Sequence, residues 1–109
     1  MSTRLPQPIA DYIQAANAHD TGALLSAFTV DAVVADEGCE YRGQDEIREW
    51  SDRVIQEYRA TLAVIEVTQS DYETVVRVEV AGTFDGSPIQ LGFHFNIDGE
   101  KIAALTIGG

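Results

Sequence analysis

The sequence predicts an α+β fold in which a curved antiparallel sheet wraps round three N-terminal helices. Three observations lead to this prediction. Apolar residues recur with a helical period through most of the first half of the chain, and with a period of two from residue 61 onwards. The dipeptides Asp85-Gly86 and Asp98-Gly99 are strong signals for hairpin turns between the later strands. Helices that are segregated from an antiparallel sheet define the α+β class.

The length and charge of the chain narrow its class further. Its 109 residues predict one domain over residues 1–109, in which residues 1–7 form a frayed lead-in. The formal net charge is −11, from 7 Lys and Arg against 18 Asp and Glu. Nucleic acids and anionic membranes bind cationic surfaces, so we expect neither as a partner. The chain has no run of apolar residues long enough to span a membrane and no apolar signal core at its start, and we expect a cytoplasmic protein.

Two helices are predicted near the N-terminus. Pro8 suits the first turn of a helix. This helix continues to about Ala18 and carries the apolar stripe Ile9, Tyr12, Ile13 and Ala16. Asp20 or Thr21 caps a second, short helix, whose apolar residues are Leu24, Leu25 and Phe28.

A strand and a third helix follow. The branched residues of Thr29–Asp36 predict a strand, and Glu37–Glu40 is expected to be a turn or loop. Gln44 or Asp45 opens the third helix, whose inward stripe is Ile47, Trp50, Val54 and Tyr58.

Four strands are predicted in the second half, namely Thr61–Gln69, Tyr72–Gly82, Pro88–Asp98 and Lys101–Ile107. Alternation places an apolar set on one face of the third of these strands, consisting of Ile89, Leu91, Phe93, Phe95 and Ile97. Gly82 and Gly92 are candidate bend sites. A curved sheet of this kind, wrapped round a long helix, leaves a pocket at its open end.

Two polar residues stand where they could carry chemistry. Tyr12 lies on an apolar helix stripe and points inward, where its hydroxyl can donate to a developing oxyanion. Asp36 ends a strand on the face of Val34, where an apolar pocket would raise its pKa and make it a general base. The neighbouring Glu37 acts in the same direction. The alternatives are a core tyrosine and an aspartate that caps a turn, and both are common in proteins.

The remaining reactive side chains have simpler interpretations. Alternation places His94 on the polar face of its strand, which predicts a surface or subunit-contact residue. His19 lies in the break between two helices, where a C-terminal cap is the expected role. Cys39 stands between acidic neighbours that disfavour a thiolate, so no nucleophilic role is expected. These three residues are too dispersed for a zinc site, and we expect no metal and no cofactor.

Three stretches of the chain together resemble the NTF2-like superfamily, and more narrowly its SnoaL-like and ketosteroid-isomerase-like branches. The first runs from Tyr12 through the short second helix to Asp36, and the second is Tyr41–Trp50. The third is the terminal meander with Phe93-His-Phe-Asn96 and Lys101-Ile. The resemblance covers nearly the whole chain. It implies a cone of curved antiparallel sheet round the helices, and a homodimer formed through the sheet.

The resemblance also implies roles for individual residues. Tyr12 matches the oxyanion-binding tyrosine of ketosteroid isomerases, and Asp36 matches the aspartate that shuttles the proton. Trp50 matches an aromatic pocket position. The second oxyanion donor of those enzymes, a protonated aspartate, is replaced here by Leu91. Losing such a donor costs about 10²–10³ in rate, which argues against a true steroid isomerase.

These observations predict a cavity for a small apolar or carbonyl-containing molecule. We expect Asp36 to share it with a set of apolar side chains, namely Phe28, Val34, Trp50, Leu91, Phe93 and Phe95. One hypothesis is an isomerase- or cyclase-type enzyme that abstracts a proton alpha to a carbonyl. A second is a non-catalytic ligand-binding or dimerisation domain of the same fold. A third is a hydrolase or dehydratase on the same scaffold, although a hydrolase normally needs a richer polar set.

Overall fold

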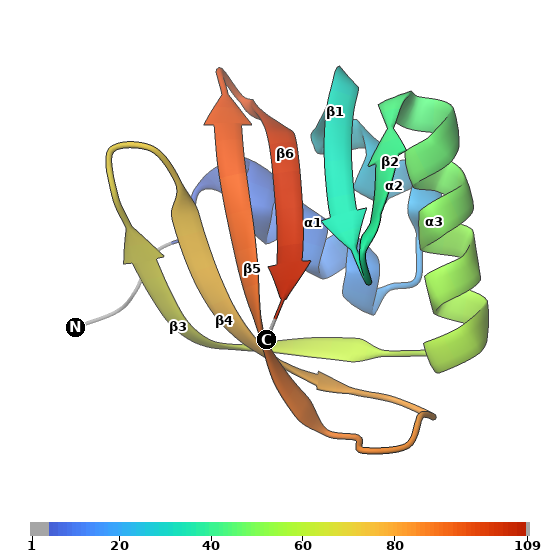
Figure 1. Ribbon diagram of the computed structural model, residues 1–109. Coiled ribbons are helices and arrows are strands. Elements are labelled where there is room, and N and C mark those ends of the chain that lie inside the picture. The colour runs from blue at the N-terminus through green and yellow to red at the C-terminus, as the bar shows by residue number, and fades with distance from the viewer. Residues whose placement is uncertain (1–4, 109) are drawn as a thin grey trace.

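The computed structural model describes residues 5–108 of the chain (Figure 1). Residues 1–4 of the predicted lead-in lie outside the described residues, and the first helix already begins at Gln7. In chain order the elements are α1 Gln7–Asn17, α2 Thr21–Ser26, β1 Phe28–Asp36, β2 Cys39–Arg42, α3 Gly43–Tyr58, β3 Thr61–Gln69, β4 Thr74–Ala81, β5 Ile89–Asp98 and β6 Lys101–Gly108. The predicted α+β class is confirmed, with three helices and the four-stranded meander in the predicted order.

All six strands form one open, curved sheet in the order β2-β1-β6-β5-β4-β3. Neighbouring strands are antiparallel except β1 and β6, which pair in parallel. The predicted antiparallel sheet is confirmed at the other four pairings, and this one pairing is parallel. The two strands are separated in sequence by α3 and four strands, and so long a connection allows a parallel pairing that a hairpin cannot make.

The predicted turn or loop at Glu37–Glu40 is a turn at Glu37 and Gly38, and its last two residues belong to strand β2. Glu37 and Gly38 both have positive φ, 54° and 78°, which is typical of the tight two-residue turn of a hairpin. Asp36 therefore lies opposite Cys39 in the β1–β2 ladder. A strand of four residues is too short for its alternation to be recognised in the sequence.

The helices cover one face of the sheet, with α1 behind β5 and β6 and α3 beside β2 (Figure 1). The Asp20 side chain accepts a hydrogen bond from the Ala23 amide and so caps α2, as its sequence position predicts. Trp50, in the stripe of α3, is only 3% exposed. The largest fully buried side chains come from helices and strands alike, and include Ile9, Ile47, Val76, Phe95 and Leu105.

The strand β3 contains an irregularity that changes which residues face the helices. Its pairing with β4 shifts register between Val64 and Glu66, so that Ile65 is a bulge residue. Simple alternation through Ile65 places Val67 on the outer face, but Val67 packs against the core. Ile65 is 48% exposed.

The chain turns from β4 toward β5 at Gly82, where the backbone lies against the C-terminal end of α3. A Cβ atom at this position would be 2.3 Å from the Tyr58 carbonyl oxygen. Only glycine allows this approach, because real Cβ atoms do not come so close to a backbone oxygen. The predicted bend site thus holds the start of the β4–β5 loop against α3.

Candidate functional site

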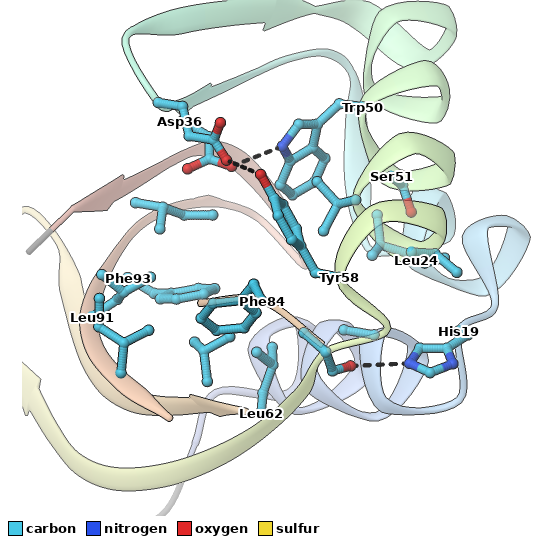
Figure 2. Close-up of a pocket in the computed structure, with 18 of the residues that line it drawn as sticks. His19, Leu24, Asp36, Trp50, Ser51, Tyr58, Leu62, Phe84, Leu91 and Phe93 are labelled. Atoms are coloured by element: carbon cyan, nitrogen blue, oxygen red, sulfur yellow. Dashed lines mark hydrogen bonds between the residues drawn. The ribbon is translucent and has the colours of Figure 1, made fainter. Parts of the chain in front are cut away.

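A cavity of about 400 Å³ lies between the sheet and the helices (Figure 2). Five aromatic rings line it, those of Tyr12, Trp50, Tyr58, Phe84 and Phe93. Most of the remaining wall is aliphatic, formed by Ala16, Leu24, Val54, Ile55, Ala60, Leu62, Val80, Ile89, Leu91 and Ile107. Its polar side chains are His19, Asp36, Glu37, Ser51 and Asp85.

Asp36 and Tyr12 both line this cavity, together with three of the predicted apolar residues, Trp50, Leu91 and Phe93. The other three predicted lining residues do not border it: Phe28, Val34 and Phe95 are buried in the core. The Phe28 and Phe95 rings pack edge-on to the Tyr12 ring, with centroids 5.9 and 5.6 Å away. The alternation identified the correct face of the sheet, but the helices cover part of that face.

Asp36 occupies the C-terminal end of β1, where its side chain is half-buried. The indole Nε1 of Trp50 donates a hydrogen bond to its Oδ2 at 3.0 Å. Burial raises the pKa of the Asp36 carboxyl, and the charge of Glu37 adds to the rise. The Trp50 hydrogen bond and the positive charge of Arg53 oppose it, but the pKa stays above the ordinary aspartate value. The raised pKa makes the Asp36 carboxylate a stronger base than an ordinary aspartate, so it can accept a proton more readily.

Tyr12 projects from α1 into the same cavity and is 3% exposed. Burial, and then the nearby Asp36 charge, raise the pKa of its hydroxyl well above the ordinary tyrosine value. The hydroxyl consequently keeps its proton and can act as a donor. Within residues 5–108 it has no hydrogen-bond partner, yet no fully enclosed side-chain oxygen there is left unpaired. The Tyr12 hydroxyl is therefore in contact with the cavity, where a ligand could accept its hydrogen bond.

The mouth of the cavity is formed by residues that sequence analysis did not single out. Tyr58, at the end of α3, donates a hydrogen bond from its hydroxyl to Glu37 Oε1 at 3.1 Å. Phe84, from the loop between β4 and β5, packs edge-on against the Tyr58 ring at 5.7 Å. Tyr58 was predicted only as part of a core stripe. Nothing in the sequence marked Phe84, because loop residues carry no periodicity.

Both histidines lie in or near the positions expected for them. His19 follows α1 with a φ of 55°, and its Nε2 donates a hydrogen bond to the Ala60 carbonyl at 3.0 Å. It also borders the cavity, which its sequence position did not predict. His94 is directed away from the cavity, and its Nδ1 lies 3.4 Å from Glu73 Oε2.

Residues 5–108 lack two features, a metal-binding cluster and a membrane-spanning helix. No group of three His, Cys, Asp or Glu side chains is arranged there to hold a metal ion. No helix in that part of the chain is both long and apolar enough to cross a membrane.

The curved sheet, the three helices and the cavity define the ketosteroid isomerase-like, or NTF2-like, fold. The family model for the SnoaL-like domain matches residues 9–105, and the chain belongs to this family. The predicted resemblance is thereby confirmed. A comparison with curated protein sequences found no significant match.

Several solved structures are similar to this chain over nearly its whole length. A Sinorhizobium meliloti protein, provisionally named a polyketide cyclase, is 35% identical, with 94% of each chain covered and a TM-score of 0.91. A Sphaerobacter thermophilus protein is 29% identical, with 93% of this chain and 91% of that chain covered and a TM-score of 0.79. A Catenulispora acidiphila protein with a ketosteroid isomerase-like fold, solved with trimethylamine, shares 16% identity. The coverage there is 97% of this chain and 87% of that one, the TM-score is 0.85, and the likeness shows the fold alone.

Proposed function

We propose that the cavity binds a small carbonyl compound and that the protein removes a proton from the carbon alpha to the carbonyl. Asp36 is the general base and Tyr12 is the oxyanion donor. The observation that carries the proposal is that both residues border one largely apolar cavity. A base and a donor that flank the same ligand are what enolate formation requires.

In this reaction the carbon–hydrogen bond breaks and its proton passes to the Asp36 carboxylate. The electron pair moves onto the carbonyl oxygen, where the Tyr12 hydroxyl stabilises the negative charge by donating a hydrogen bond. Trp50 donates a hydrogen bond to Asp36 Oδ2, and the carboxylate keeps further lone pairs with which it can accept the proton. Return of the proton to another carbon gives an isomer, whereas attack of the enolate carbon on a second carbonyl closes a ring.

The walls of the cavity support a neutral ligand. Its described lining includes the carboxyl groups of Asp36, Glu37 and Asp85, but no Lys or Arg. A carboxylate or phosphate ligand would meet like charge from these carboxylates, with no Lys or Arg in the described lining to bind it. The similarity to the Sinorhizobium meliloti protein supports the cyclase form of the reaction.

Hydrogen–deuterium exchange at the alpha carbon of 2-tetralone tests the proposal, because exchange requires only enolate formation. We expect the protein to accelerate exchange in D₂O, followed by NMR. Asp36→Asn should abolish the acceleration and Tyr12→Phe should reduce it by about 10²–10³. Asp31→Asn, an exposed carboxylate on the same strand, is the matched control and should match the unchanged protein. Exchange that survives Asp36→Asn would reject the base assignment.

A second candidate is a non-catalytic ligand-binding domain. Leu91 lines the cavity at the position where the resemblance leads us to expect the second oxyanion donor, and this favours binding without turnover. Under this alternative, 2-naphthol, a planar mimic of the enolate, would bind and quench Trp50 fluorescence, while 2-tetralone would exchange no faster than in buffer.

A further inference from the structure

Tyr58 stands between the exposed rim of the cavity and its buried floor. The floor residues Tyr12 and Phe93 are each 3% exposed, whereas Glu37 and Asp85 at the rim are exposed. The half-buried Tyr58 side chain, at the end of α3, donates its hydrogen bond to Glu37. Figure 2 shows Phe84 beside it. A ligand that approaches Asp36 from the rim therefore meets the Tyr58 ring.

The backbone of Tyr58 is held firmly. Its carbonyl oxygen accepts hydrogen bonds from the Thr83 amide at 2.8 Å and from the Thr83 hydroxyl at 3.2 Å. Gly82 lets the loop approach this carbonyl, and Arg59 ends the helix immediately afterwards with a φ of 45°. The end of α3 is thus tied to the β4–β5 loop, and the part of Tyr58 that is free to move is its side chain.

The Tyr58 side chain is held much more weakly than its backbone. Its contacts across the mouth are the exposed hydrogen bond to Glu37 and the edge-on packing against Phe84. A solvent-exposed hydrogen bond contributes little net free energy, since water replaces either partner. The side chain can therefore change rotamer without any movement of the backbone that carries it.

We infer that the Tyr58 side chain is a gate, closed by its hydrogen bond to Glu37, and that it determines which ligands enter the cavity and how fast. The inference rests on the proposed use of this cavity for a ligand, and it adds a specificity-determining residue that takes no part in proton transfer. With the gate closed, the Tyr58–Glu37 bridge narrows the mouth. Ligands wider than the closed mouth enter only while the ring is rotated away.

Access to the cavity can be measured without any ligand, because Trp50 is the only tryptophan of the chain and lines the cavity. Acrylamide is a small neutral quencher that must reach the indole to act. We expect Tyr58→Phe and Glu37→Ala each to raise the quenching constant by about two- to threefold, since each removes the closing bond. The double variant should gain little more, because both changes break the same interaction. Tyr72→Phe removes a hydroxyl from a side chain that is 87% exposed and should change nothing.

Ligand kinetics give the second readout. N-phenyl-1-naphthylamine, a neutral probe that brightens in apolar cavities, can be mixed rapidly with each variant. Tyr58→Phe should speed association and dissociation together by about two- to threefold and leave Kd within about twofold. Unchanged quenching and unchanged rates in both Tyr58→Phe and Glu37→Ala would overturn the gate. Neither readout involves turnover. A failure of 2-tetralone exchange would therefore reject the proposed chemistry, whereas the quenching and binding rates would still test the gate.

Discussion

Asp36 carries a carboxyl group that the fold takes partly out of water, and burial raises its pKa above the ordinary value of 3.8. The folded chain then binds the proton more tightly than the unfolded chain does. Stability consequently falls as the pH rises from the unfolded pKa through the raised folded pKa. Ionisation of Asp36 therefore lowers the free energy of unfolding, although the proposed chemistry uses the ionised form.

We therefore predict that Asp36→Asn raises the melting temperature at pH 7 by a few degrees while it removes activity. Asparagine keeps an oxygen to accept the Trp50 hydrogen bond and carries no charge to desolvate. The gain should vanish at a pH below the unfolded pKa, where the native carboxyl is also neutral. Calorimetry at both pH values, with Asp31→Asn as the control, measures this. A variant that melts below the unchanged protein at pH 7 would contradict the prediction.

Trp50 has two functions that different substitutions separate. Trp50→Ala removes a large side chain from a residue that is 3% exposed, and the resulting cavity should lower the free energy of unfolding by about 3–5 kcal/mol. Denaturant titrations followed by circular dichroism measure this loss. Trp50→Phe keeps a ring but removes the donor that lowers the pKa of Asp36. For this variant we expect a smaller stability loss, and an inflection of the exchange rate that moves to higher pH. An inflection that stays in place would show that the indole does not tune the carboxyl.

At the scale of the secondary structure elements, substitution of two glycines by alanine should change the stability of the protein in opposite directions. Gly82→Ala places a methyl group 2.3 Å from the Tyr58 carbonyl and forces α3 and the β4–β5 loop apart. We predict a loss of about 1–3 kcal/mol and faster acrylamide quenching of Trp50. Gly22→Ala, in α2, meets only ordinary contact at 3.5 Å and should stabilise the protein by up to about 1 kcal/mol. Equal effects of the two substitutions on the melting temperature would contradict the tight approach at Gly82.

At the scale of the whole molecule, the outer face of the sheet is the expected dimer surface. It mixes apolar and polar side chains, with Ile65 and Val75 beside Arg77, His94 and Asn96, as subunit interfaces commonly do. Each chain carries a formal charge of −11, so salt should strengthen association by screening the repulsion between two copies. Sedimentation equilibrium at low and high salt should show a dimer that tightens with salt. A monomer at micromolar concentration under both conditions would contradict the prediction.

Apart from the short β2, the sequence alone determined the order of helices and strands, because hydrophobic periodicity is a local property. It placed Tyr12 on the inward stripe of α1, and Asp36 at the end of β1, and the structure has both residues there. It also identified the inward face of β5, because side chains alternate strictly along a strand. The family could be recognised for the same reason, since its elements follow one another in a characteristic order and spacing.

Only the tertiary structure decided which of these inward-facing residues line the cavity and which are packed in the core. Alternation assigns Phe93 and Phe95 to one face, but how the helices lie on the sheet decides that Phe93 borders the cavity and Phe95 is core. The parallel pairing of β1 with β6 and the approach of Tyr58 to Glu37 are contacts between distant segments. Such contacts depend on sheet curvature and on loop paths, which no local pattern of residues specifies.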